Sequence, residues 1–106
     1  MRLGPLERRV LQVLWRRADF ARVREVLPEF PDIAYTTLMT TLERLHRKGI
    51  LERVFNGRAF SYRPSSTRAE TALSFVLEEV GTVDEATLTE LERLVRERRR
   101  ALKEES

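Results

Sequence analysis

Threonine and arginine side chains occupy one side of a predicted helix at residues 34–48, which reads AYTTLMTTLERLHRK. At 100° per residue, Leu38, Leu42 and Leu45 fall within about 60° of one another, so they predict the buried stripe of this helix. The side chains on the opposite side are hydroxylic near the start and basic near the end: Thr36, Thr37, Thr40, Arg44 and Arg47. Small residues at the front of a helix let its backbone come close to base edges, so this side could enter the major groove of DNA.

The residue types on this side match the hydrogen-bonding groups of DNA. A threonine offers its hydroxyl to a base or a phosphate and its methyl group to the thymine methyl, and an arginine can reach guanine O6 and N7 or a phosphate. The unpaired N–H groups at the helix start also favour a phosphate there. Tyr35 opens the helix and could either pack inside or contact DNA. An exposed threonine-rich side can also be merely polar, so this pattern needs support from the elements around it.

Two further helices are predicted before this one. Pro5 begins the first, which runs to about residue 17, because proline is favoured at the first helical position. A short helix follows at about residues 22–27, and the prolines after it end it and force an irregular connection. Gly49 stands just past the end of the helix at residues 34–48, where a left-handed C-cap residue is expected.

A β-hairpin is predicted directly after the third helix. Asn56-Gly57 lies between two β-type runs, and this dipeptide is a strong signal for a two-residue turn in which both residues take positive φ. Such a turn would pair Phe55 with Arg58, Arg53 with Phe60, and Leu51 with Tyr62. The hairpin tip would lie near the DNA backbone or the minor groove, and its candidate contacts are Arg53, Asn56, Gly57 and Arg58. The spacing of Trp15, Phe60 and Tyr62 indicates residues that pack inside.

The basic charge is concentrated in the same part of the chain. Residues 1–64 hold 13 Lys/Arg and 7 Asp/Glu, a net +6, whereas residues 65–106 hold 7 and 10, a net −3. The first part is therefore the candidate for a polyanionic partner. Of the 20 basic residues 18 are arginine, which suits phosphate recognition but is also what a GC-rich genome produces.

The order helix, short helix, turn, helix and hairpin is that of a helix-turn-helix with a wing. We therefore predict a mainly α fold with a small β-hairpin wing: a winged helix-turn-helix DNA-binding domain at residues 1–64, followed by a C-terminal helical dimerisation arm at residues 65–106. Double-stranded DNA is the expected partner. The sequence has neither an apolar run of about 18 residues nor a signal-peptide core, so we expect no membrane partner and a cytoplasmic location.

The C-terminal arm is predicted to hold two helices. Thr67 with Glu70, and Thr82 with Glu85, match the capping-box pattern at their starts. Apolar residues on one side of each helix give the candidate homodimer interface: Leu73, Val76, Leu77, Leu88, Leu91, Val95 and Leu102. A single winged-helix unit contacts few bases, whereas two units on one dimer would add their contacts on two half-sites. The same apolar stripe could instead pack on its own domain.

Catalysis and metal binding are not expected. The sequence holds no nucleophile–base pair, no phosphate-cradling glycine loop and no carboxylate cluster, so we predict no enzyme. Cysteine is absent and His46 is the one histidine, so we expect neither a metal site nor a cofactor. Two alternatives within the fold remain: a winged-helix module that binds protein and not DNA, and a regulator with a small-molecule pocket between its two parts.

Four stretches of the chain resemble the penicillinase repressor family of winged-helix regulators (BlaI, MecI and CopY). They are LGPLERRVLQVLW, VREVLP, AYTTLMTTLERLHRKGILER and GRAFSYRP, which lie between residues 3 and 64. The resemblance implies a homodimeric repressor of a palindromic operator, often built on TACA/TGTA half-sites, in which the C-terminal helices dimerise. It also matches Thr36, Thr37, Thr40 and Arg44 to the recognition helix of that family, and Gly57 and Arg58 to its wing.

The sequence departs from the pattern of that family in three places. Arg22 stands where members usually carry threonine or serine as a helix cap, so this cap is missing or Asp19 supplies it. The C-terminal arm is shorter than usual and matches no cleavage site of the drug-responsive members. The cysteine motif of the copper-responsive members is absent. The inducing ligand or protease is therefore unknown.

Overall fold

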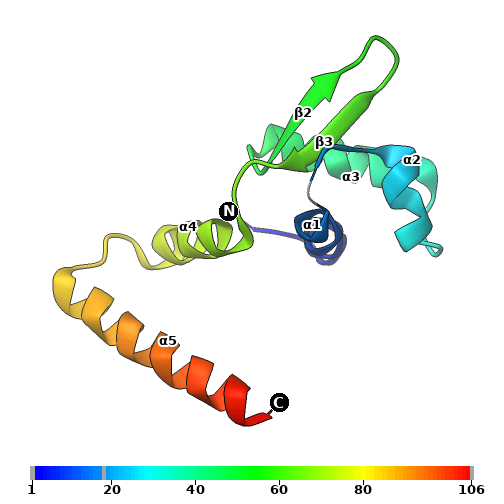
Figure 1. Ribbon diagram of the computed structural model, residues 1–106. Coiled ribbons are helices and arrows are strands. Elements are labelled where there is room, and N and C mark those ends of the chain that lie inside the picture. The colour runs from blue at the N-terminus through cyan, green and yellow to red at the C-terminus, as the bar shows by residue number, and fades with distance from the viewer. Residues whose placement is uncertain (1, 18, 106) are drawn as a thin grey trace. The chain divides into compact units, whose positions relative to one another are not determined.

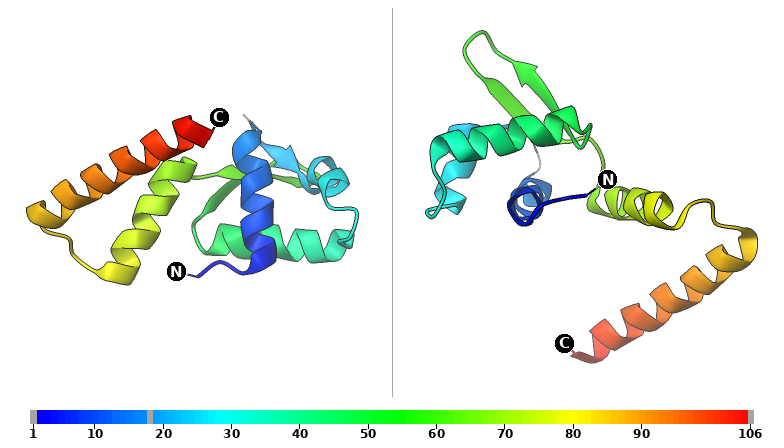
Figure 2. Two further views of the ribbon diagram at one scale, coloured as in Figure 1. Left: turned by 90° about the horizontal axis from the view of Figure 1, so that it is seen from below. Right: turned by 180° about the vertical axis from the view of Figure 1, so that it is seen from behind.

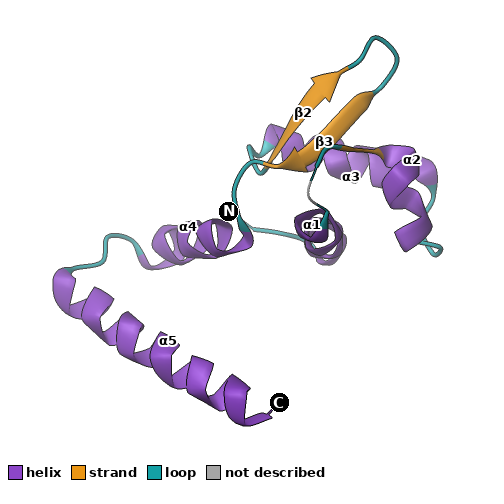
Figure 3. Cartoon of the chain, in the orientation of Figure 1, coloured by secondary structure: helices purple, strands orange, loops and turns teal. Residues whose placement is uncertain are grey.

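The computed structural model describes residues 2–17 and 19–105, and it divides the chain into two compact units. The first unit runs to Leu73 and the second begins at Ser74. Figures 1 and 3 show that all strands belong to the first unit and that the second is helical. No helix of the described residues is long and apolar enough to cross a membrane.

Three α-helices form the body of the first unit: α1 at Pro5–Arg16, α2 at Val23–Val26 and α3 at Tyr35–Arg47. Proline stands at the start of α1, as predicted. Helix α2 is shorter than predicted, because the chain continues as a 3₁₀ turn, η1, at Leu27–Glu29, where proline removes a backbone donor. Helix α3 ends before Gly49, whose φ of +79° confirms the predicted left-handed C-cap.

The sheet of the first unit has three antiparallel strands in the order β1-β3-β2. Strands β2 (Leu51–Phe55) and β3 (Phe60–Pro64) form the predicted hairpin, and its loop end projects away from the helices (Figures 1 and 2). The two-residue strand β1 (Ala21–Arg22) was not predicted, and it pairs with the middle of β3. Two residues are too few to show an alternating pattern in the sequence.

The predicted register of the hairpin is wrong. Phe55 pairs with Phe60, and Arg53 with Tyr62, so the turn is centred one residue later than Asn56-Gly57. Asn56 takes no positive φ, and its side-chain oxygen accepts hydrogen bonds of 3.0 Å from the N–H groups of Arg58 and Ala59. Only glycine takes positive φ in this turn, with a φ of +94° at Gly57. The side chain of Asn56 therefore replaces the backbone geometry that the sequence pattern predicted.

The hydrophobic core lies where α1, α2 and α3 meet the sheet. Its fully buried side chains are Val10, Leu11, Leu14, Ala21, Val26, Phe30, Leu38, Leu42, Leu45 and Leu51. The three leucines of α3 thus form the buried stripe predicted from their spacing. Because this stripe is fixed inward, the opposite side of α3 is fixed outward.

The first unit extends past residue 64 because the chain after β3 is bonded to it. Ser65 N–H donates to the Ile50 carbonyl at 2.9 Å, and Trp15 Nε1 donates to the Ser66 carbonyl at 3.2 Å. Thr71, in the second turn of α4 (Arg68–Val80), is buried. The start of α4 is therefore part of the winged-helix body, and the predicted boundary at residue 64 falls before the end of the first compact unit.

The second unit holds the end of α4 and the helix α5 (Glu85–Glu105). The capping box of Thr67 and Glu70 at the start of α4 is confirmed by reciprocal hydrogen bonds of 3.0 and 3.1 Å. The capping box predicted at Thr82 is wrong. Asp84 caps α5, since its carboxylate accepts from Thr87 N–H at 2.8 Å, and an aspartate caps as well as a threonine does.

Candidate nucleic-acid interface

The outward side of α3 is exposed along its length. Leu38, Leu42 and Leu45 have no exposed surface. The candidate contacts on the opposite side are all solvent-exposed: Tyr35, Thr36, Thr37, Thr40, Arg44 and Arg47. Within the chain, nothing in the first unit covers the surface that the sequence predicted for DNA.

Two threonine hydroxyls of α3 are bonded back to the helix. Thr40 Oγ1 donates to the Thr36 carbonyl at 2.9 Å, and Thr41 Oγ1 donates to the Thr37 carbonyl at 2.8 Å. Thr41 is buried, so its hydroxyl satisfies itself inside the protein. Thr40 is exposed, and its oxygen keeps its acceptor lone pairs for a donor outside the helix.

A groove of about 450 Å³ runs between the start of α1 and α3, and we call it the helix-side groove. It is lined by Gly4, Pro5, Leu6, Glu7, Thr36, Thr37, Thr40, Thr41 and Arg44. Most of the predicted recognition residues of α3 therefore face one hollow. The carboxylate of Glu7 is its one acidic group, and it is held by Gly4 N–H at 2.9 Å and by Lys48 Nζ at 2.8 and 2.9 Å.

The Glu7–Lys48 pair joins the start of α1 to the end of α3. Burial raises the pKa of Glu7, but the hydrogen bonds from Gly4 and Lys48 outweigh it, so this pKa lies below its ordinary value. The side chains of Glu7 and Lys48 are 8% and 27% exposed, so solvent screens this pair less than a surface pair. The lowered pKa means that the ionised carboxylate stabilises the fold.

Glu7→Gln is expected to lower the free energy of unfolding by about 1–3 kcal/mol at neutral pH, because it removes a charge-assisted bond and leaves Lys48 without its partner. The stabilisation is present above the ordinary carboxylate pKa and is lost as pH falls through the lowered pKa. Urea unfolding from pH 3 to 7 should therefore show the wild type and the variant converging in acid. The matched control is Asp32→Asn in the exposed pair with Arg9, which should change little. Parallel curves for wild type and Glu7→Gln would contradict this role.

A larger groove of about 580 Å³ lies on the other side of α3, between α2, α3 and the hairpin, and we call it the wing-side groove. It is lined by Arg22, Val23, Arg24, Tyr35, Met39, Phe55, Arg58, Ala59, Phe60 and Tyr62. Of the predicted contacts it brings together Tyr35 and Arg58. It also contains Arg22 and Arg24, which the sequence analysis missed because they come from a different element and follow no shared period with α3.

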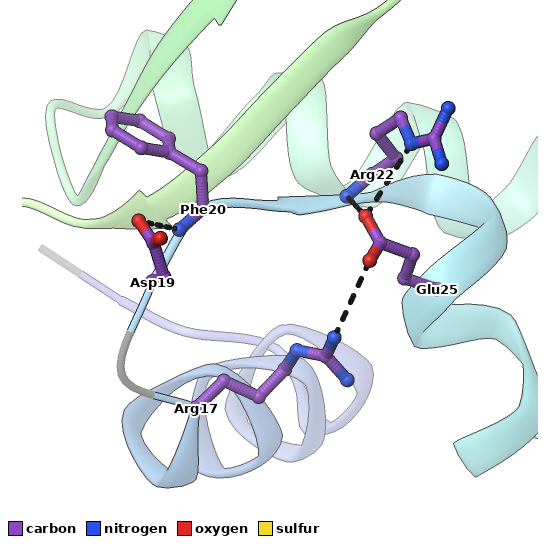
Figure 4. Close-up of polar contacts among 5 residues, drawn as sticks. All are labelled: Arg17, Asp19, Phe20, Arg22 and Glu25. Atoms are coloured by element: carbon purple, nitrogen blue, oxygen red, sulfur yellow. Dashed lines mark hydrogen bonds and ion pairs between the residues drawn. The ribbon is translucent and has the colours of Figure 1, made fainter.

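Arg22 reaches this groove because another residue takes over the capping of α2. The Glu25 carboxylate accepts from the Arg22 backbone N–H at 2.9 Å, and this bond lowers the pKa of Glu25 (Figure 4). Arg22 Nε and Arg17 lie 3.4 and 3.8 Å from the same carboxylate. Asp19 instead accepts from Phe20 N–H at 2.7 Å, so the suggestion that Asp19 caps α2 is wrong.

The hairpin carries an exposed aromatic cluster. Phe55 and Phe60 have ring centroids 5.1 Å apart and are 59% and 38% exposed, so the prediction that Phe60 packs inside is wrong, although Tyr62 is buried as predicted. The register shift puts Phe55 opposite Phe60, near the turn. Arg53 lies over the Phe60 ring at 3.8 Å, so this candidate contact is engaged by the hairpin itself.

The candidate dimerisation residues lie on α4 and α5, and most are exposed within the chain. Those with at least 39% of their surface exposed are Leu73, Val76, Leu77, Leu88, Val95 and Leu102, and Leu91 is half-buried. No side chain described between Ser74 and residue 105 is buried. His46 Nδ1 lies 3.2 Å from the Leu51 carbonyl, and the described residues hold no group of three potential metal ligands.

Three helices with a hairpin at the end of the third define the winged helix-turn-helix class, which confirms the predicted fold class. Two solved structures share this fold: M. tuberculosis Rv0081 (23% identity, TM-score 0.54, 90% of this chain and 82% of that one) and a MarR family protein from Bacillus stearothermophilus (16% identity, TM-score 0.54, 97% and 77%). The sequence matches the penicillinase repressor family over residues 3–97, and the chain belongs to that family.

One relative gives the comparison more detail. The chain is 35% identical over 88 residues to the transcriptional regulator BlaI of Mycobacterium tuberculosis. The match covers 80% of this chain and 64% of the relative, so the chain spans less than two thirds of the length of that protein. The family resemblance of the sequence is thereby confirmed.

Proposed function

We propose that the protein is a DNA-binding transcriptional regulator, a homodimeric repressor that binds a palindromic operator. The observation that carries this proposal is the exposed hydroxylic and basic side of α3, anchored by three fully buried leucines. Its family and its BlaI relative support the same function. Helix α3 would enter the major groove with Thr36, Thr37, Thr40 and Arg44 toward the bases, while Gly57 and Arg58 bring the wing to the backbone or the minor groove.

The proposed division of labour follows the two parts of the chain. Residues 1–64 would read DNA, and residues 65–106 would dimerise. Folding leaves the apolar residues of α4 and α5 exposed, and helices with exposed apolar sides associate when a partner is available. Two copies would place two α3 helices on half-sites about one helical turn apart.

The test is a selection of bound fragments from random duplex DNA with the purified protein. An enriched inverted repeat is the expected result. If no duplex is retained at any salt concentration, the alternative of a winged-helix module that binds protein is correct.

Arg44→Ala is expected to weaken binding to the selected operator by about 5- to 150-fold, the equivalent of about 1–3 kcal/mol for one bidentate base contact. The preference at one position of each half-site should relax, since a base contact carries sequence information and a phosphate contact does not. Repeating the selection with the variant measures this. Arg16→Ala, an exposed arginine of α1 outside both grooves, is the control. Equal weakening on all sequences would make Arg44 a phosphate contact.

A further inference from the structure

Positive charge is unbalanced in one of the three hollows of the first unit. In the helix-side groove one glutamate accompanies one arginine. A third hollow of about 450 Å³, beside Trp15, contains two arginines and two glutamates: Arg17, Arg63, Glu52 and Glu70. The wing-side groove contains three arginines and no acidic residue. An anionic ligand is therefore favoured in the wing-side groove and not in the other two.

The three arginines reach this groove from two separate elements. Arg22 and Arg24 come from β1 and α2, whereas Arg58 comes from the hairpin turn. Arg24 and Arg58 have no acidic partner among the described residues, and Arg22 Nε makes only a long contact of 3.4 Å with Glu25. Their guanidinium groups are therefore available to an external anion from both sides of the groove.

The remaining wall of the groove is apolar and exposed. Met39 on α3 is 40% exposed, and the Phe55 and Phe60 rings lie beside the turn. Aliphatic and aromatic side chains contact the C–H groups of deoxyribose as well as they contact one another, because both are apolar. The groove thus offers cations along two sides and an apolar surface between them.

We propose that the wing-side groove seats one sugar–phosphate strand of duplex DNA, with Arg22 and Arg24 as phosphate contacts on one side and Arg58 on the other. This inference rests on the proposed function, since Tyr35 and Met39 place the groove directly beside the recognition side of α3. A polymer with repeated charges matches cations delivered from two elements better than a single small anion does, because duplex DNA carries a charge about every 1.7 Å of its axis. Arg22 and Arg24 would fix the register of α3 without reading bases.

The test measures binding to a fluorescent random-sequence duplex over a series of salt concentrations, with wild type, Arg24→Ala, Arg22→Ala and the control Arg16→Ala. Each lost phosphate contact should reduce the slope of log affinity against log salt by about 0.9 per bound protomer. The control should keep the wild-type slope. Arg24 is exposed and lacks an acidic partner, so Arg24→Ala should keep the wild-type melting temperature and carry the test even if Arg22→Ala disturbs Glu25.

The outcomes separate this inference from the proposed function. Wild-type slopes for both groove variants, with a wild type that binds duplex, would overturn the groove assignment alone. A wild type that binds no duplex would overturn the function and the inference together. A loss confined to single-stranded oligonucleotides would show base stacking on the exposed rings, and would also overturn the assignment of a duplex strand.

Discussion

Val95→Glu is expected to make the protein monomeric and to weaken binding to the selected operator by on the order of 100-fold or more, since each half-site would then be bound separately. Val95 is 56% exposed within the chain, so a carboxylate there costs the isolated protomer little. In an apolar interface between two copies the same carboxylate would lose its water, at a much larger cost. Sedimentation analysis and operator titration measure the two effects.

The control for this prediction is Thr89→Glu, which adds the same charge on α5. At 100° per residue position 89 lies about 120° from Val95, and Thr89 is exposed. This variant should remain dimeric. A Val95→Glu protein that sediments as the wild type does would remove α5 from the proposed interface, and the apolar residues of α4 would then be the next to test.

Leu42→Ala is expected to lower the free energy of unfolding by about 2–5 kcal/mol, because Leu42 is fully buried between α3 and the rest of the first unit and its truncation leaves a cavity. This is a large part of the total stability of a small domain, which is about 5–15 kcal/mol. Denaturant titration measures it. Operator affinity should be nearly unchanged at temperatures where the variant is folded, since Leu42 points away from the candidate interface.

Met39→Ala is the matched control for Leu42→Ala. It lies on the same helix and is 40% exposed, so its truncation should change stability only slightly. If the two variants were equally stable, the inward stripe of α3 would not be what fixes the orientation of its outer side.

The helices of the first unit could be predicted from the sequence, and the hairpin register could not. The bounds of α3 were predicted to within one residue at each end, because its leucine period and Gly49 both mark them. The turn was misplaced because a side-chain bond of Asn56 decides its geometry, and the Asn-Gly pattern describes only backbone preference. Strand β1 was missed because its pairing with β3 is a long-range contact between two short segments.

The candidate site was predicted in part for the same reason. The residues on α3 share one helix, so their common side follows from spacing alone. Arg22 and Arg24 join Arg58 only after α2 and the hairpin have packed on α3, and no periodicity in the sequence connects them. A prediction of this groove requires the tertiary structure.

The capping of α2 has a consequence for how this chain can diverge. The hydrogen bond that holds the start of α2 is made by the backbone N–H of residue 22 and the carboxylate of Glu25. Any amino acid except proline supplies that N–H, so position 22 is relieved of the duty of providing an oxygen. Its side chain is free to be selected for the surface it presents, while Glu25 keeps the turn in place.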